Sequence, residues 1–502
     1  AGAIRTLLLW ASTRIAFSSG ADLGLEVYRR TLYQPYWIHV ARNSSEVISG
    51  ITNKVNGVAF MVLLPSLRLV SSIMLLLVIM LALVAIDLIV ALAVAFGFGA
   101  SYAVTTWISR GKLKRNSQRI AYEQTKVVKA VQEGLGGIRD LLLDGTQPFY
   151  CDIFRQADQR LRLAQGNNVF IGESPRYVIE TLGIVLIAAL AYILSLQVGG
   201  IITSLPVLGA LALGAQRLLP ALQQIYRAWA SIVGSHVSLA DTIALLNQPL
   251  SAELLQPAPK PLLIQNVICF SNVRFRYNGD SPWVLDGVNL AIPKGARVGF
   301  VGSTGSGKSS TLDLLMGLLM PTEGKILVDG QLISGNKVRA WQQTIAHVPQ
   351  SIFLADTTLA ENIAFGVPPD TIDLKRVKQA AHQAQIADFI ESSPEGYQAK
   401  VGERGMRLSG GQRQRIGIAR ALYKQASVLV FDEATSALDS VTEQSVMDSI
   451  EGLASDLTIL IIAHRLTTVR HCHTIVKLEC GKVVAQGTFD QLYNSNLNRE
   501  ET

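Results

Sequence analysis

Little charge and little cysteine distinguish this chain of 502 residues from an ordinary soluble protein. Only 17% of its residues are charged, against about 25% in typical soluble domains. Its four cysteines (Cys151, Cys269, Cys472 and Cys480) form no CxxC pair, so neither a disulfide framework nor a zinc knuckle is indicated. The His-Cys-His triplet at 471–473 has no second ligand pair at finger spacing and does not predict a metal site.

Long runs of basic residues are also lacking. The net charge of +7 and the pI near 9.2 could suggest nucleic acid as a partner, but no cluster of Lys and Arg supports that, and we predict no nucleic-acid binding. The chain starts with Ala instead of Met, which we interpret as a fragment or a processed product. Its first residues do not have the pattern of a signal peptide.

Charge is absent from three long stretches of the first half. Residues 69–86 and 88–109 carry none, and 181–216 is a run of 36 uncharged residues, too long for a single span of about 20. The sequence QVGG at 197–200 is a natural turn that divides this run. We therefore predict a polytopic helical membrane domain.

The basic residues indicate how these helices are oriented. The segment 110–165 begins with Lys112, Lys114, Arg115 and Arg119, whereas the short connections near Asp87 and at 197–200 contain no Lys or Arg. The positive-inside rule places 110–165 in the cytoplasm and the short turns outside. If 31–54 is also cytoplasmic, a helix at about 1–28 arrives from outside, and we expect one more helix upstream.

Helices at 55–85 and 88–125 exceed the length that a bilayer requires, so we expect them to project into the cytoplasm. Two aromatic segments lie between such helices, at 34–44 and 141–150. They are either docking elements for a soluble domain or plain loops, and their composition favours docking.

Residues 247–263 contain four prolines and no apolar periodicity, which is typical of a linker. Beyond them, short β-branched runs alternate with helical stretches, as in an α/β nucleotide-binding domain. We accordingly predict three parts: a membrane domain at 1–245, a linker at 246–262, and an α/β P-loop ATPase domain at 263–502.

A phosphate-binding loop has the sequence GSTGSGKS at 302–309, between a predicted strand (296–302) and a helix. Glycines in such a loop let backbone N–H groups surround phosphates, a lysine reaches the β- and γ-phosphates, and a hydroxyl ligates Mg²⁺. The residues that we expect to bind ATP here are Gly302, Ser303, Thr304, Gly305, Ser306, Gly307, Lys308 and Ser309.

Three further strands end in residues suited to the same site. The strand at 427–433 ends in Asp432, a candidate Mg²⁺ ligand, and Glu433, a candidate general base. The strand at 457–464 ends in His464, which we expect to sense the γ-phosphate. Gln350 follows another predicted strand and has the same kind of placement.

A second phosphate-seeking loop, LSGGQ at 408–412, precedes a predicted helix. A Ser hydroxyl, free glycine N–H groups and a helix N-terminus make an anion site that its own chain's ATP does not require. We predict that it completes the site of a neighbouring copy, with two ATPase domains facing head to tail. The alternative is an ordinary glycine-rich turn.

These motifs together resemble ABC-transporter ATPases. GSTGSGKS, HVPQ (347–350), VGERGMRLSGGQRQRIGIARAL (401–422), VLVFDEATSALD (428–439) and AHRL (463–466) occur in the order and spacing of that family. Membrane helices fused ahead of this domain resemble an ABC exporter half-transporter of the type IV arrangement. The resemblance implies six helices, the second to sixth at about 1–28, 55–85, 88–125, 165–196 and 201–235, with the two aromatic cytoplasmic segments as coupling helices.

The resemblance also implies individual roles. Tyr277 matches the residue that stacks on adenine, Glu403 a residue that contacts coupling helices, and Asp439 the D-loop. Catalytic roles fall to Glu433, His464, Lys308 and Gln350, and Mg²⁺ binding to Ser309, Gln350 and Asp432. ATP contacts extend to Ser310 and, in the opposite copy, to Ser409, Gly410, Gly411 and Gln412. Both sites of a homodimer should then hydrolyse ATP, although a heterodimer is an alternative.

The transported substrate is indicated only by the membrane half. Arg14, Arg68 and Arg217 lie in apolar segments, where charge usually faces a cavity or a partner. They either line a cavity for an anionic head group, or extend from helix ends towards the interface or pair with Asp22, Glu26 or Glu180. The sequence GAQRLLPALQQIY (214–226) resembles the sixth helix of lipid-linked oligosaccharide flippases and cyanobacterial envelope-glycan exporters.

We therefore expect an ATP-driven exporter or flippase of the plasma or inner membrane. Its ATPase domain is expected in the cytoplasm. Its substrate is expected to be hydrophobic or lipid-linked, with a lipid-linked oligosaccharide or a glycolipid as the favoured cargo. A peptide or drug exporter and a membrane-anchored regulatory ATPase are the alternatives.

Overall fold

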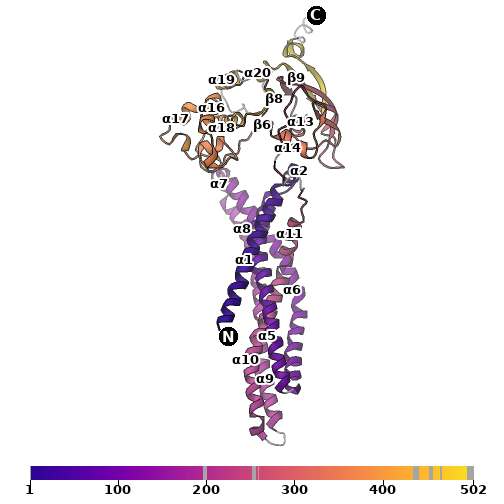
Figure 1. Ribbon diagram of the computed structural model, residues 1–502, viewed down its shortest axis with the longest axis vertical. Helices are drawn as coiled ribbons and strands as arrows, with labels where there is room; N and C mark the ends of the chain where they lie inside the picture. The colour runs from indigo at the N-terminus through magenta and orange to yellow at the C-terminus, as the bar shows by residue number, and fades with distance from the viewer. Residues whose placement is uncertain are drawn as a thin grey trace. The chain divides into compact units, whose positions relative to one another are not determined.

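The computed structural model describes residues 2–86, 88–195, 200–250, 256–257, 259–433, 440–451, 456–463 and 466–494 (Figure 1). The chain divides into two compact units. One comprises Ala1–Gln34 and Ile38–Leu250, and the other Pro35–Trp37 and Ser251–Thr502.

The first unit is built of helices joined by short non-helical connections (Figure 1). Its helices are α1 (Gly2–Leu32), α2 (Tyr36–Ala41), α3 (Ser44–Ser49), the π-helix η1 (Gly50–Lys54), α4 (Val55–Val58), the π-helix η2 (Ala59–Leu63), α5 (Leu64–Ile86), α6 (Leu88–Gly136), α7 (Ile138–Asp144), α8 (Gln147–Glu173), α9 (Pro175–Ser195), α10 (Gly200–Gly234) and α11 (His236–Leu246).

Two helix boundaries differ from those predicted. The helix expected to begin at 165 is two helices, because α8 continues to Glu173 and α9 begins at Pro175. Pro175 has no N–H for the Ile171 carbonyl, which instead accepts a hydrogen bond from the Tyr226 hydroxyl at 3.1 Å. The helix expected at 55–85 is part of a run that starts at Ser44. Pro65 has no N–H for the Met61 carbonyl, which instead accepts a hydrogen bond from Ser231 on α10 at 2.8 Å.

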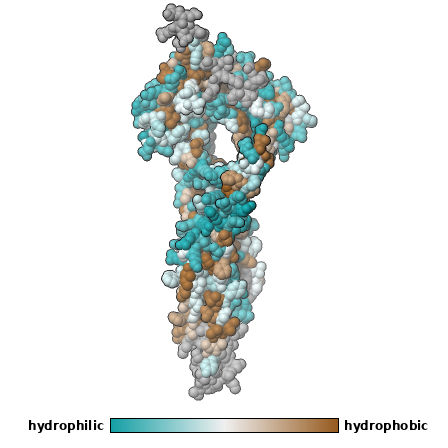
Figure 2. Space-filling model, turned by 180° about the vertical axis from the view of Figure 1, so that it is seen from behind, coloured by the Kyte–Doolittle hydropathy of each residue, from teal (hydrophilic) through white to brown (hydrophobic). Residues whose placement is uncertain are grey.

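Two helical runs of the described residues are long and apolar enough to cross a membrane, Ser44–Ala85 and Ala91–Gly136. A third results if Gln216–Gly234 and His236–Leu246, which meet at 56°, count as one span. Large hydrophobic side chains are exposed here, among them Phe96 (80%) and Trp107 (82%), and Figure 2 shows hydrophobic surface over the helices. The other predicted spans stay predictions.

Two of the carboxylates suggested as partners for the intramembrane arginines pair elsewhere. Glu26 bonds to Arg29 and Arg30, and Glu180 to Arg176. The side chains of Arg14 and Arg217 are exposed in this unit. Their proposed role in a substrate cavity stays a prediction.

The second unit is an α/β domain with two sheets. The antiparallel sheet has the order β2-β1-β4-β5, formed by β1 (Val267–Phe275), β2 (Leu285–Pro293), β4 (Glu323–Val328) and β5 (Gln331–Leu332). The larger sheet has the order β10-β9-β3-β8-β7-β6, formed by β3 (Arg297–Val301), β6 (Ile345–Val348), β7 (Val428–Asp432), β8 (Thr458–Ile462), β9 (Thr474–Glu479) and β10 (Lys482–Gly487).

Helices lie between these strands in the chain. They are α13 (Lys308–Leu315), α14 (Asn336–Gln342), α15 (Leu359–Ile363), α16 (Leu374–Gln383), α17 (Ala387–Glu391), α18 (Gly410–Tyr423), α19 (Ser440–Glu451) and α20 (Leu466–Val469), with the short helices η3 (Pro369–Thr371), η4 (Gly396–Gln398), η5 (Glu403–Gly405) and η6 (Asp490–Asn494).

The pairing of the larger sheet determines where the site lies. Strands β3, β8, β7 and β6 are adjacent and parallel, and their apolar side chains are buried, as expected for a parallel sheet covered on both faces. Parallel strands bring their carboxyl ends to one edge, where α/β proteins place their ligand sites. The residues that follow these strands therefore gather at one edge of the sheet.

Candidate functional site

The loop between β3 and α13 has the backbone of a phosphate cradle. Gly302, Gly305 and Gly307 have φ values of 150°, 80° and 100°, which residues with a Cβ rarely adopt. A Cβ at Gly307 would lie 2.6 Å from the Leu285 side chain, and one at Gly302 would collide with the carbonyl oxygen of Leu478. A side chain at Gly302 or Gly307 would therefore force the loop or its neighbours to move, whereas Gly305 is constrained by its φ alone.

Lys308 lies inside this loop. Its side chain is buried, and its Nζ donates to the carbonyl oxygens of Gly302 at 2.8 Å and Ser303 at 2.9 Å. The hydroxyl of Ser306 is buried without a hydrogen-bond partner. Because a buried unpaired hydroxyl is unfavourable, this loop, with a buried ammonium and an unused hydroxyl, has the chemistry to take up a polyphosphate.

Glu433 and Gln350 meet at the carboxyl ends of the neighbouring strands β7 and β6. Gln350 Nε2 donates to Glu433 Oε2 at 2.8 Å. Glu433 has a φ of 51°, a left-handed conformation that costs a residue other than glycine about 1 kcal/mol or more and that clusters at active sites. The backbone N–H of Glu433 bonds to the Ile462 carbonyl at 3.1 Å, which orients this carboxylate at the sheet edge.

Asp313 on α13 is a carboxylate of this region that sequence reasoning missed. Burial, with the Asp432 carboxylate nearby, raises the pKa of Asp313 to about 6. The signal in the sequence was a charged residue within the otherwise apolar run TLDLLMG (311–317).

Replacing Asp313 by Asn should stabilise the nucleotide-free protein at neutral pH. The folded-state pKa lies above the unfolded value of 3.8, so ionising Asp313 destabilises the fold increasingly between about pH 4 and pH 6 and by a constant amount above that. Allowing for solvent screening, we expect about 1–2 kcal/mol at pH 7.5. Thermal unfolding of both proteins from pH 4 to pH 8 measures this; a stabilisation that is largest at pH 4 would contradict it.

Tyr277 lies beside the phosphate loop and is half exposed. Its hydroxyl is 3.3 Å from Ser310 Oγ, its ring packs edge-on against Phe275 at 5.0 Å between centroids, and 52% of the residue is exposed. Aromatic contacts of this kind hold a ring at a set angle while leaving its open face available. The arrangement is suited to stacking on a planar base.

The pentapeptide LSGGQ forms the start of α18. Ser409 Oγ accepts a hydrogen bond from the Gln412 N–H at 3.2 Å, and Gln412 Oε1 accepts from the Ser409 N–H at 2.8 Å. This capping box stabilises the helix start and leaves the Ser409 hydroxyl proton and the first glycine N–H groups for an anion. Within the described ranges, no hydrogen bond joins 409–412 to the loop at 302–310.

Arg420 is a second residue that the motifs did not reveal. From α18 its Nε donates to the Asn362 carbonyl at 2.9 Å and its Nη2 to the Phe353 carbonyl at 3.0 Å, while its guanidinium lies over the Phe365 ring. Burial lowers the pKa of Arg420 to about 10. Arg420 therefore links α18, the helix that begins within LSGGQ, to the segment that follows Gln350. A charged residue between the buried Ala419 and Ala421 was the available signal.

The structure thus brings together most of the predicted nucleotide residues of one chain. The loop 302–310, Gln350, Asp432 and Glu433 follow or end adjacent strands at one sheet edge. Two predicted residues, Asp439 and His464, lie outside the described residues, and Glu403 opens the short helix η5.

Comparison with known proteins supports the same interpretation. A family profile described as ABC transporter matches residues 285–436. The chain is 31% identical over 489 residues to an ATP-dependent lipid A-core flippase of Cupriavidus metallidurans, covering 94% of this chain and 79% of the relative. A protein of the same name from Burkholderia orbicola is 30% identical over 497 residues, covering 97% and 80%.

Similarity to other relatives is confined to part of the chain. A leukotoxin translocation ATP-binding protein of a Pasteurella haemolytica-like species is 42% identical over 233 residues, 46% of this chain and 33% of that protein. Among solved structures, a bacterial Atm1-family ABC exporter with ATP bound matches with a TM-score of 0.83 and 26% identity, over 97% of this chain and 87% of that one. The similarity of sequence and fold across both units shows that this chain belongs to the ABC transporter family, as a half-transporter whose membrane domain is fused to an ATPase domain.

Proposed function

We propose that this ATP-driven exporter flips a glycolipid, an amphipathic lipid with a glycan head group, from one leaflet of its membrane to the other. The observation that carries the proposal is the extent of the similarity to proteins named lipid A-core flippases, which includes the membrane unit. The relative named for toxin translocation matches over less than half of this chain. Because cargo is bound by the membrane helices, the relatives that share those helices are the better guide.

The ATP-hydrolysing residues have proposed roles that follow from their positions. Backbone N–H groups of 302–307 and the Lys308 ammonium bind the phosphates, and Tyr277 stacks on the base. The ligands for Mg²⁺ would be the Ser309 hydroxyl, Gln350 and Asp432; when bound, this ion neutralises phosphate charge.

The proposed hydrolytic step uses Glu433 as the base. Its carboxylate, held by Gln350 at 2.8 Å, takes a proton from a water molecule as the water oxygen forms a bond to the γ-phosphorus. The bond from that phosphorus to the β–γ bridging oxygen breaks, and its electron pair leaves with ADP. His464 is proposed to contact the γ-phosphate. Asp439, which matches the D-loop residue of the family, is proposed to contact ATP as well.

A second copy would complete each site. The exposed start of α18 presents the Ser409 hydroxyl and the N–H groups of Gly410 and Gly411 without a phosphate loop of its own chain within hydrogen-bonding distance. We therefore propose a head-to-tail homodimer with two equivalent ATP sites. We also propose a multi-pass location in the plasma or inner membrane, with the membrane domain at 1–245, the linker at 246–262 and the ATPase domain at 263–502 in the cytoplasm.

Reconstitution into liposomes tests the cargo. Two fluorescent probes would be compared, a lipid A-core-type glycolipid and a polyprenyl-pyrophosphate oligosaccharide, with ATP-dependent loss of accessibility to a membrane-impermeant quencher as the measurement. We expect flipping of at least one glycan-bearing probe by the parent protein and none by Glu433→Gln. ATP hydrolysis without movement of either probe would contradict the glycolipid proposal and favour a peptide or drug cargo, or a regulatory ATPase.

A further inference from the structure

The last helix of the membrane unit, α11, leads directly to the linker. It ends at Leu246, and residues 247–250 are the final, non-helical residues of that unit. The chain passes between the two units here and on either side of Pro35–Trp37, so this short segment is one of the places where a displacement can be transmitted along the chain. Non-helical residues adjust their backbone angles easily unless they are held, so the contacts of 246–250 decide whether movement is transmitted or absorbed.

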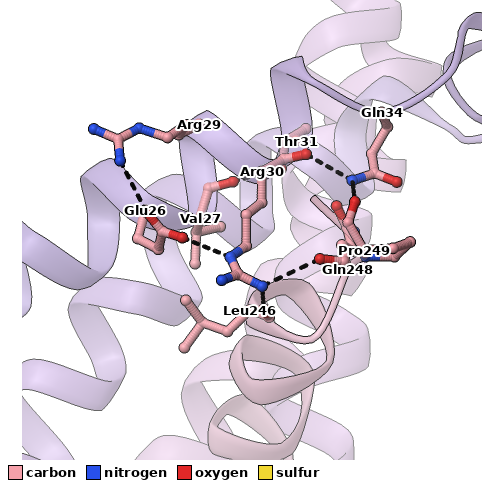
Figure 3. Close-up of polar contacts among 9 residues, drawn as sticks. All are labelled: Glu26, Val27, Arg29, Arg30, Thr31, Gln34, Leu246, Gln248 and Pro249. Atoms are coloured by element: carbon pink, nitrogen blue, oxygen red, sulfur yellow. Dashed lines mark hydrogen bonds and ion pairs between the residues drawn. The ribbon is translucent and has the colours of Figure 1, made fainter. Parts of the chain in front are cut away.

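Arg30 on α1 holds this segment (Figure 3). Its Nη1 donates to the carbonyl oxygens of Leu246 and, at 3.2 Å, Gln248, and its Nε bonds to Glu26 Oε1 at 2.6 Å. The last carbonyls of a helix have no partner within the helix, and a cation there is favourable with respect to the helix dipole. One guanidinium thus caps α11 and ties the linker to α1.

Gln34, one turn further along the chain, makes a second tie (Figure 3). Its Nε2 donates to the Pro249 carbonyl at 3.1 Å and to the Arg30 carbonyl at 2.8 Å. Gln34 and Gln248 are both only 6% exposed. With its amide oriented to satisfy both atoms, Gln248 also accepts from Arg42 Nη1 at 2.6 Å. The backbone carbonyls of Gln248 and Pro249, the two residues that follow Asn247, are therefore held by Arg30 and Gln34.

The other end of α11 is held as well. At its start, the Val237 N–H donates to Ser117 Oγ at 3.0 Å, and Asn168 Nδ2 donates to the Gly234 carbonyl at 3.4 Å. These bonds satisfy groups that the 56° bend after α10 would otherwise leave unpaired. In the middle of α11, Asp241 forms an ion pair with Lys54 of η1 at 2.6 Å.

From these contacts we infer that α11, held by its bonds to α1, η1 and α6, moves as a rigid element, which we call the lever. Arg30 is the positioning residue that lets this helix transmit movement between the ATPase and membrane units. The inference rests on the proposed transport function. It concerns coupling and not ATP chemistry, because no residue of the lever belongs to the nucleotide site described above.

A matched pair of arginines provides the test. Arg29 and Arg30 are neighbours that both pair with Glu26, but only Arg30 also reaches the linker carbonyls. We would compare Arg30→Ala with Arg29→Ala in the full-length protein in nanodiscs. Arg30→Lys keeps the charge beside Glu26 but cannot reproduce the guanidinium fork, and it serves as a second variant that preserves the fold.

The measurement is the distance between spin labels at Leu88→Cys in the two copies, with and without ATP and vanadate. Leu88 begins α6 and is 57% exposed, and the two exposed cysteines, Cys151 and Cys480, are replaced by Ser. ATP hydrolysis is measured on the same samples. Thermal unfolding is followed in parallel, so that all spectra are recorded well below the transition.

We expect Arg30→Ala to hydrolyse ATP within about twofold of the parent while the fraction of labels that shift falls by about three- to tenfold. In Arg29→Ala the fraction of shifted labels should equal that of the parent protein. In Arg30→Lys this fraction should lie between those of the parent and Arg30→Ala. Full shifting in Arg30→Ala, or equal losses in both arginine variants, would overturn the lever. A parent protein that hydrolyses ATP without any shift would overturn the proposed transport cycle, and the lever with it.

Discussion

Replacing Glu433 by Gln should reduce ATP hydrolysis by about 10²- to 10⁴-fold while leaving ATP bound. The amide has nearly the same shape and retains an oxygen that can accept the hydrogen bond now made by Gln350 at 2.8 Å. It cannot take a proton from water. The expected result is a protein that binds nucleotide and turns over at the background rate, measured as phosphate release alongside binding of a fluorescent ATP analogue.

Glu479→Gln is the control for this substitution. Glu479 is a carboxylate at the end of β9 that forms an exposed ion pair with Lys477 at 2.7 Å, so removing its charge should change hydrolysis less than about twofold, since exposed pairs contribute little. If Glu433→Gln retained more than a tenth of the parent activity, another group would have to be the base. Loss of ATP binding in the same variant would instead assign Glu433 to binding.

Gly302→Ala should abolish ATP binding and destabilise the ATPase domain by about 2–4 kcal/mol. Gly302 has a φ of 150°, and a Cβ there would collide with the Leu478 carbonyl and lie 2.7 Å from Ser306 Oγ. Leu478 is in β9, the neighbour of β3, so the added atom must push either the strand or the loop out of place. Lys308, whose ammonium bonds to the Gly302 carbonyl at 2.8 Å, would be displaced with it.

Gly305→Ala separates collision from backbone strain in the same loop. Gly305 also has a positive φ, 80°, but a Cβ there would meet nothing within 4 Å. We expect a loss of about 1 kcal/mol and ATP binding weakened without being lost. Thermal unfolding and nucleotide titration of both variants measure the difference; similar behaviour of the two would mean that the collision at Gly302 is relieved by a small shift.

Much of the ATP site could be predicted because its signals are local. A glycine loop between a strand and a helix, or two carboxylates after a buried strand, requires only a few consecutive residues, and the structure has those strands where they were expected at 297–301, 428–432 and 458–462. Parallel pairing then brings Gly302, Gln350 and Glu433 to one edge. The capping box of Ser409 with Gln412 is local in the same way.

Other features depend on residues far apart in the chain. Arg420 bonds to carbonyls at 353 and 362, and the pKa of Asp313 depends on burial and on Asp432; neither partner is recognisable from sequence spacing. Within the helical run from Ser44 to Ile86, the Met61 carbonyl, which Pro65 cannot serve, accepts a hydrogen bond from Ser231. A prediction from one segment has no access to such partners.

Sequence alone was sufficient for the ATPase family, the strand-flanked motifs of the candidate nucleotide site and a charge-poor helical half, because composition, periodicity and short motifs are properties of neighbouring residues. The three-dimensional fold was needed to show that Arg30 and Gln34, more than two hundred residues before the linker carbonyls they bind, hold the last residues of the membrane unit. The acceptors there are backbone carbonyls, which every residue carries. No side-chain pattern marks them, so only folding reveals which arginine reaches them.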